Sequence, residues 1–298
     1  MIRRIARITR ITRIALPFAA IVLVAWGDVG HRLTGEAAAL RMPSAMPAFF
    51  RNASRQLGYL NPEPDRWKDR NEKDPALYGG TSPDHFVDWE MASPAVLAGA
   101  LKAPNRYAYA DSLAAGGVKA SVFGFLPFRM LELAQTLRVD FRNWRAAPDS
   151  IKPWIEQRII DDAGILGHYV ADASNPSHVS DQFNGWTRAN PNGYATDKQF
   201  HARFESIYVG AHIKLGDVLA KVDTNARLLP DFRAAIVEYL KESNAQIEPL
   251  YKLDKAHPFD ANTTAPENKA FTTDRLAAGA RMLRDIWWTA YVTSGEAH

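Results

Sequence analysis

The sequence contains no cysteine. This excludes disulfide bonds, thiolate metal ligands and a cysteine nucleophile. A chain of 298 residues can bury a large core without disulfides, so their absence is compatible with a stable fold. With 47% hydrophobic and 23% charged residues, the composition is typical of globular proteins and excludes disordered and collagen-like chains.

Acidic residues are absent from the first 25 positions, which hold five arginines. Without that segment the chain has 31 basic and 33 acidic residues, so the formal net charge changes from +3 to −2. Residues 26–298 therefore lack the basic excess that is typical of proteins that bind long nucleic acid electrostatically.

Long hydrophobic runs are also lacking. The apolar run after the arginines, residues 14–25, has 12 residues, whereas a membrane-spanning helix needs about 20. Arginines followed by a short apolar run are typical of a signal peptide. The sequence predicts cleavage after Ala25 and export to the periplasm or the medium. Leu23, three residues before the predicted cut, is larger than the residue that signal peptidases usually accept there. An uncleaved membrane anchor is therefore the alternative.

The spacing of apolar residues predicts a mainly α fold. They recur three and four positions apart in several segments, which indicates helices with one buried face. These segments are residues 122–143, 151–172, 198–221, 231–251 and 268–293. No alternating run predicts a strand. No repeat or linker separates a second domain, so we expect one multi-helix bundle over residues 26–298.

Two segments break the helical pattern and are predicted to be long loops. Residues 58–84 hold four prolines and three glycines, and residues 181–197 contain two Asn-Gly pairs. Loops of this length in a compact domain are often functional.

Histidines stand beside carboxylates at spacings that metal sites use. His168 and Asp172 are four residues apart, as are His201 and Glu205, so on a helix each pair shares one face. Imidazole and carboxylate without sulfur suit zinc in a hydrolytic site. A single pair of this kind is more often a hydrogen bond on a helix surface. Two such pairs and His178 lie within 38 residues, which favours a metal site.

Four ordered blocks resemble the zinc-dependent phospholipase C and single-strand-specific nuclease superfamily. They are WGDVGH at residues 26–31, HFVD at 85–88, GHYVADASNPSH at 167–178 and HARFE at 201–205. The resemblance implies hydrolysis of phosphoric esters with three zinc ions, held by loops and helices around one trinuclear site. Asn175-Pro176 in the third block should end a helix and let His178 point back.

The resemblance also implies which residues hold zinc. One ion would take Asp65, His85, His168 and Asp172, a second would take His178, His201 and Glu205, and a third would take Trp26 and His31 with Asp172 as a bridge. Asp69 is the alternative to Asp65. Trp26 would bind through its own amine and carbonyl, which requires cleavage after Ala25.

Two catalytic roles follow from the resemblance. Asp65 would orient the attacking water or take its proton. Lys68, at a place where the nucleases have an arginine, would stabilise charge on the phosphate. A solvated loop charge is the alternative for Lys68.

Some residues resemble those of the nucleases and others resemble those of the phospholipases, so the sequence points to two substrate classes. Phe86 would stack a base and Asp88 would read its edge, as in the nucleases. A core aromatic and a helix N-cap are the respective alternatives. Glu205, in contrast, resembles the phospholipase ligand. Further candidates for substrate contact in residues 181–197 are Phe183, Trp186 and Tyr194, with loop anchoring as the alternative.

The expected protein is therefore an exported zinc hydrolase of phosphoric esters. Its leading substrate is single-stranded nucleic acid or nucleotides, and phospholipid is the alternative. A metal-storing or adhesive binding protein without turnover is a third interpretation. We expect no transmembrane span in the mature chain and infer no stable protein partner.

Overall fold

The computed structural model describes residues 27–69 and 71–296, and over these residues it is helical with no β-strand. This confirms the predicted mainly α fold. An isolated bridge joins Phe183 and Gly185. Over the same ranges, no helix is both long enough and apolar enough to cross a membrane. The predicted signal peptide and Trp26 lie outside the described residues.

Seven helices in the described part of the chain have ten or more residues. They are α1 (Gly27–Leu40), α7 (Arg106–Ala115), α9 (Leu126–Ala146), α10 (Lys152–Ser174), α14 (Phe232–Asn244), α15 (Ile247–Ala256) and α16 (Pro266–Thr293).

Shorter helices connect them. The α-helices among these are α2 (Ala48–Arg51), α3 (Ser54–Leu60), α4 (Glu63–Arg66), α5 (Ala76–Thr81), α6 (Pro94–Ala100), α8 (Ala120–Phe123), α11 (Phe200–Ala202), α12 (Val209–His212) and α13 (Leu215–Leu219). The 3-10 helices are η1 (Ser82–His85), η2 (Trp89–Met91) and η3 (Pro176–His178), and η4 (Arg203–Tyr208) is a π-helix.

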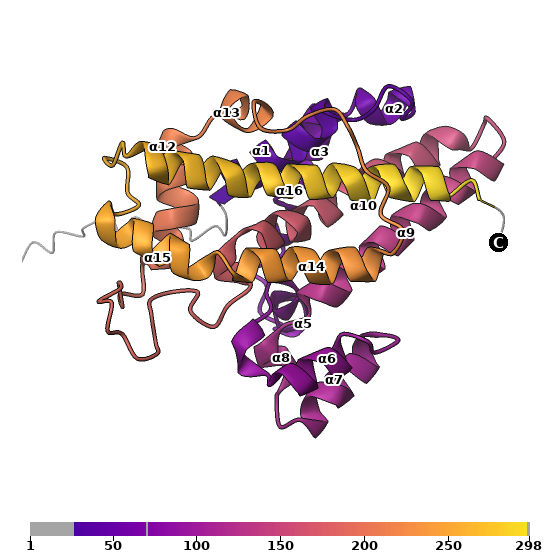
Figure 1. The fold of residues 1–298 in the computed structure, drawn as a ribbon. Helices are drawn as coiled ribbons and strands as arrows, with labels where there is room; N and C mark the ends of the chain where they lie inside the picture. Colours follow the sequence, from indigo (N-terminus) through magenta and orange to yellow (C-terminus); the bar gives the residue numbers. More distant parts are fainter. Residues whose placement is uncertain (1–26, 70, 297–298) are drawn as a thin grey trace, which may run out of the picture.

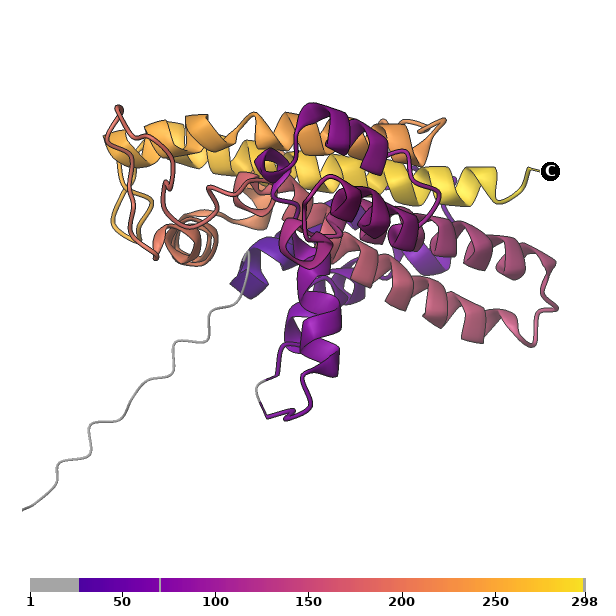
Figure 2. The same cartoon turned by 90° about the horizontal axis from the view of Figure 1, so that it is seen from below.

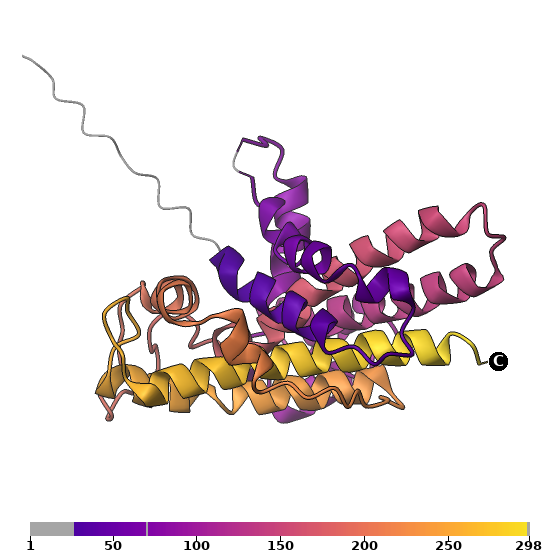
Figure 3. The ribbon, with the colours of Figure 1, turned by 90° about the horizontal axis from the view of Figure 1, so that it is seen from above.

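Helix α10 lies at the centre of the bundle. It packs against α1, α3, α9, α14 and α16 (Figures 1 and 3). Residues 166–174 are all buried, and a helix that is buried on every side belongs to the core. Helices α9 and α10 form an antiparallel pair whose connecting turn lies at one end of the molecule, whereas α5 stands out from the body (Figure 2).

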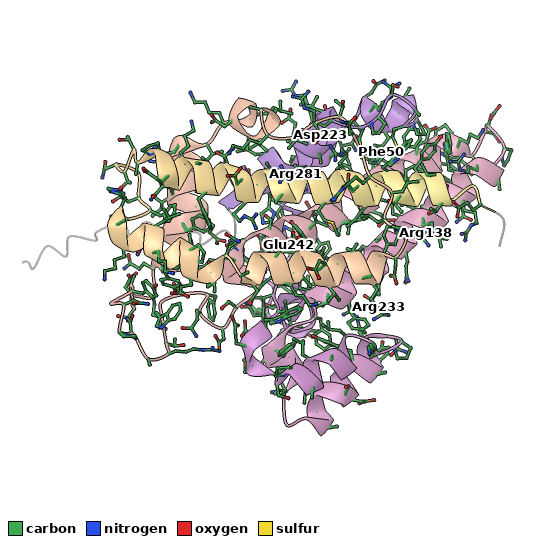
Figure 4. The ribbon with its side chains drawn as sticks, in the orientation of Figure 1. Phe50, Arg138, Asp223, Arg233, Glu242 and Arg281 are labelled. Atoms are coloured by element: carbon green, nitrogen blue, oxygen red, sulfur yellow. The ribbon has the colours of Figure 1, made fainter. Side chains whose placement is uncertain are left out.

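Aromatic packing closes the core beside α2. The ring of Phe50, labelled in Figure 4, lies 5.2 Å from that of Trp287 on α16 and 6.0 Å from that of Phe141 on α9. All three side chains are fully buried. This cluster ties helices from both ends of the chain to the centre.

The prediction of one long loop over residues 58–84 is wrong, because α4 and α5, the end of α3 and the start of η1 lie within it. Prolines fit the first turn of a helix, where the missing N–H has no partner in any case. Pro64 occupies this place in α4 and Pro83 in η1. Residues 181–197 contain no helix, as predicted.

Two predicted long helices are interrupted. Residues 198–221 divide into α11, η4, α12 and α13, with extended backbone at Ile213 and Lys214 before α13. The break is stabilised by Asp217, whose carboxylate accepts the N–H of Lys214 at 2.9 Å. Residues 231–251 divide into α14 and α15. In one continuous helix, the ring of Pro249 would clash with the carbonyl group four residues earlier.

The predicted helix over residues 122–143 is broken at Gly124, which has φ +101° and separates α8 from α9. A Cβ at this position would lie 1.9 Å from the carbonyl oxygen of Phe86. Gly124 therefore allows the segment that follows His85 to pack against the start of α9.

Substitution of Gly124 by alanine tests this close approach. We expect Gly124→Ala to lower the free energy of unfolding by at least about 2 kcal/mol, because the side chain needs both a strained backbone and space that Phe86 occupies. Urea denaturation measures the change. The matched control is Gly210→Ala on α12, where a Cβ meets nothing within 4 Å and where alanine should be neutral or stabilising. Equal stabilities of the two variants would contradict this account.

Candidate metal centre

All the predicted ligands within the described residues converge on one buried region. Their side chains come from seven elements: His31 from α1, Asp65 from α4, His85 from η1, His168 and Asp172 from α10, His178 from η3, His201 from α11 and Glu205 from η4. They form three groups that could hold a metal ion: His31, His168 and Asp172; Asp65, His85 and His168; and His178, His201 and Glu205.

The group around His168 is compact. Its Nε2 lies 2.8 Å from Nδ1 of His85 and 3.8 Å from Oδ1 of Asp65. Asp65 Oδ1 is also 3.8 Å from His85 Nδ1. Three donor atoms from three elements therefore surround one point.

Asp172 connects this group to the others. Its Oδ2 lies 3.1 Å from His85 Nδ1 and 3.1 Å from His168 Nε2. Its Oδ1 lies 3.4 Å from His31 Nε2 and 3.5 Å from His178 Nδ1. The side chain is completely buried. One carboxylate thus presents its two oxygens to different sets of histidines, as the predicted bridge requires.

The third group is built around Glu205. Its Oε2 lies 2.9 Å from His201 Nε2, on the preceding helical turn, and 3.4 Å from His178 Nε2. The π-helical turn of η4 carries Glu205, and such turns often occur at functional sites. A Cβ at Gly27 would lie 3.5 Å from the carbonyl oxygen of Glu205, so α1 begins beside this group.

Backbone carbonyls orient two of the histidines. Nδ1 of His168 lies 3.0 Å from the carbonyl oxygen of Asn61, and Nδ1 of His178 lies 2.8 Å from that of His85. A carbonyl only accepts, so each Nδ1 must carry the proton. In the neutral form of each imidazole, Nε2 would then carry the lone pair, and such contacts are common around metal-binding histidines.

Glycine makes the first of these contacts possible. A Cβ at Gly167 would lie 2.1 Å from Nδ2 of Asn61, so a larger residue would push the end of α3 away from α10. The carbonyl of Asn61 would then move away from His168.

The pKa values of two histidines and two carboxylates suit metal binding at neutral pH. Burial lowers the pKa of His31 to about 3 and that of His85 to about 4, so both imidazoles are neutral. Burial opposes ionisation of Asp172, but His178 and His168 outweigh it and hold its pKa well below the usual value. Glu205 behaves similarly beside His201 and its pKa falls to about 2.

Unpaired donor atoms test whether the residues fit a metal. Buried polar atoms normally have a hydrogen-bond partner, and a missing one costs about 1 to 3 kcal/mol. Three buried atoms that face the ligand groups have none: Nε2 of His31, Oδ2 of Asp65 and Oδ1 of Asp172. Nitrogen and oxygen donors in this number fit zinc.

Lys68 and Asp65 lie together at the edge of the group. Nζ of Lys68 is 2.7 Å from Oδ1 of Asp65 and 3.4 Å from Nδ1 of His85. Asp69 is exposed and accepts hydrogen bonds from Asn71. The structure therefore places Asp65, and not Asp69, among the histidines.

The two predicted substrate contacts follow His85. Phe86 is half-buried. Asp88 occupies the N-cap position of η2, but its carboxylate makes no capping hydrogen bond. Burial, with Asp181 and Glu90 nearby, raises the pKa of Asp88 to about 7.

The aromatic residues of the 181–197 loop have two different environments. The rings of Trp186 and Tyr194 lie 5.2 Å and 5.8 Å from that of Tyr251, so both anchor the loop to α15. Phe183 is 47% exposed, and its ring lies edge-on, 6.2 Å from that of His201. Phe183 is thus the loop aromatic that borders the ligand groups.

Sequence reasoning missed the residues that support the ligands. Asn61 orients His168 through its backbone, for which no side-chain pattern exists. Asn175, identified only as a helix end, donates to Glu205 at 3.1 Å. The sequence signal that could have identified Asn175 is its position before Pro176 in the block at residues 167–178.

The pKa of His178 yields a test on the metal-free protein. Burial lowers this pKa, but Asp172 and Glu205 outweigh burial and raise it to about 9. The bound proton therefore stabilises the fold fully below pH 6.5, and this contribution is lost as the pH rises through 9. The measurement is urea denaturation of the chelator-treated wild type and the chelator-treated His178→Gln variant. We expect the free energy of unfolding of the wild type, minus that of the variant, to fall between pH 6.5 and 9. A difference independent of pH would contradict the assignment.

No protein-family model and no curated protein matches this chain. Among solved structures, a similar one is the alpha-toxin of Clostridium perfringens from avian strain SWCP, with 13% sequence identity and a TM-score of 0.45. The match covers 92% of this chain and 66% of the toxin chain, so this chain spans less than two thirds of that protein. A likeness at this level assigns neither a family nor an activity.

Proposed function

We propose that this protein is a zinc-dependent hydrolase of phosphoric esters whose substrate is single-stranded nucleic acid or nucleotides. The observation that carries the proposal is the close approach of the three ligand groups. His168 belongs to two of them, and Oδ1 of Asp172 lies 3.5 Å from Nδ1 of His178 in the third. Metal storage does not require adjoining metal sites with a lysine, Lys68, and a half-buried aromatic residue, Phe86, beside them. These features favour catalysis over storage.

The proposed division of the ligands is the one that the resemblance implies. Asp65, His85, His168 and Asp172 would hold one ion; His178, His201 and Glu205 a second; His31, Asp172 and Trp26 a third. Bound zinc would neutralise phosphate charge and lower the pKa of water. A ligand role for the amine of Trp26 requires cleavage after Ala25, so the proposal includes export.

Asp65 has the geometry of a group that orients water and accepts a proton. Its Oδ1 is bonded to Lys68, whereas Oδ2 has no hydrogen-bond partner. Burial raises the pKa of Asp65, but His168 and Lys68 outweigh burial and lower it, so the carboxylate is ionised at neutral pH. Oδ2 is then available to water.

Lys68 would meet the phosphate. Its side chain is 26% exposed, so its ammonium group reaches both Asp65 and solvent. A fixed cation at this edge stabilises charge that develops on a phosphoryl group. With a net charge of −2 over residues 26–298, attraction for phosphate must come from such local charges and from the metal ions.

Phe86 and Phe183 are the proposed stacking residues, and Asp88 the residue that reads a base edge. Phe86 follows the ligand His85 in the chain, and Phe183 borders His201. Aromatic stacking tolerates any base, which suits an enzyme of single strands. Glu205, which resembles the ligand of the phospholipases, favours phospholipid as the second candidate substrate.

The shared carboxylate of Asp172 leads to a prediction about metal content. Wild-type protein should contain close to three zinc ions. Asp172→Asn should lose about two of them and all activity, because its two oxygens would bind two different ions, whereas His201→Ala should lose about one. Elemental analysis measures zinc, and circular dichroism checks that helix content is unchanged.

The matched control is His212→Ala, since His212 lies outside the three groups and contacts the carbonyl of Asp260. It should retain all three ions. A wild-type protein with one zinc or none would refute the metal centre.

A substrate panel tests the second half of the proposal. We expect hydrolysis of single-stranded DNA, RNA or a 3'-nucleotide, with little or no release from phosphatidylcholine. Phe86→Ala should raise KM for single-stranded DNA by roughly 5- to 150-fold, the equivalent of one lost stacking interaction of about 1 to 3 kcal/mol.

The control for this substitution is Trp154→Ala, which removes a 74% exposed aromatic residue at the start of α10, outside the three ligand groups. Its KM should equal that of the wild type. Activity on phosphatidylcholine alone would replace the nuclease proposal by the phospholipase one.

A further inference from the structure

Asn175 lies at the joint between the ligand-bearing helix α10 and the turn η3. It is the C-cap residue of α10, and its backbone N–H donates to the carbonyl of Asp172 at 2.9 Å. Its side chain is fully buried. Asn175 therefore stands between two ligands, Asp172 and His178, without being in any of the three groups.

The acceptor end of its side chain holds the turn. Oδ1 accepts the backbone N–H of Ser177 at 3.0 Å, and the backbone carbonyl of Asn175 accepts the N–H of His178 at 2.9 Å. These bonds reverse the chain direction immediately after α10. The reversal places the imidazole of His178 back against Asp172, at 3.5 Å.

The donor end of the same side chain holds a ligand from a distant segment. Nδ2 donates to Oε2 of Glu205 at 3.1 Å. This oxygen is the one that lies closest to His201 and His178. Since a carboxylate has two rotatable oxygens, a fixed donor on one of them sets its direction.

We infer that Asn175 is a positioning residue for the group of His178, His201 and Glu205: one amide sets both the turn that returns His178 and the direction of the Glu205 carboxylate. The inference rests on the proposed metal centre. An amide suits both tasks because it has an acceptor and a donor at opposite corners and carries no charge. An aspartate would place a second carboxylate against Glu205, and a serine is too short to reach it.

Zinc affinity of Asn175 variants tests the inference, measured by competition with a chromophoric chelator. Asn175→Ala should weaken one of the three ions by about 10- to 100-fold and leave the other two unchanged, as is typical when a contact that orients a ligand is lost. Asn175→Ser keeps a hydroxyl that can accept from Ser177 but loses the donor to Glu205. It should fold like the wild type and show the same selective weakening.

The control is Asn268→Ala. Asn268 is also fully buried, and its Nδ2 donates to the carbonyl of His257, outside the ligand groups. This variant loses stability but should keep all three zinc affinities. Wild-type affinities in Asn175→Ser, or equal weakening of all three ions, would overturn the inference. A wild-type protein that binds no zinc would instead refute the proposed function.

Discussion

The buried carboxylate of Asp172 is the interaction on which the centre of this structure depends. A fully buried anion is unfavourable unless opposite charge and hydrogen bonds surround it. Asp172 obtains part of this: Oδ2 lies 3.1 Å from Nδ1 of His85 and 3.1 Å from Nε2 of His168, and His178 lies 3.5 Å from Oδ1, which has no hydrogen-bond partner. The packing of α1 and of the segments around α10 therefore serves both the fold and the site, since each helix brings a partner for the same carboxylate.

Neighbouring backbone and amide groups orient the histidines around Asp172. The carbonyl of Asn61 selects the tautomer of His168, and the carbonyl of His85 does so for His178. These contacts need close approach, which Gly167 permits on α10. Donor atoms that lack hydrogen-bond partners then remain where a cation would satisfy them. Their cost to the fold would link stability to metal binding.

Much of the fold and of the site was predictable from the sequence. The mainly α class followed from apolar spacing, and the pairs His168 with Asp172 and His201 with Glu205 followed from helical periodicity. Helix ends were less predictable. Prolines in residues 58–84 begin short helices where a loop was expected, and Pro249 and Gly124 divide segments whose apolar spacing is continuous. In each case a local backbone constraint overrides the periodicity.

The sequence by itself determined the chemistry of the candidate ligands, because imidazoles and carboxylates without any thiol would leave a narrow choice of metals. It also determined which candidate ligands share a helical face, since that depends only on positions along one helix. The tertiary structure alone decided that Asp65 and not Asp69 joins the histidines, and that His168 belongs to two groups. It also decided that Asn175 reaches Glu205 across 30 residues of chain. Distances between elements depend on how their faces pack, and the spacing within one element does not encode them.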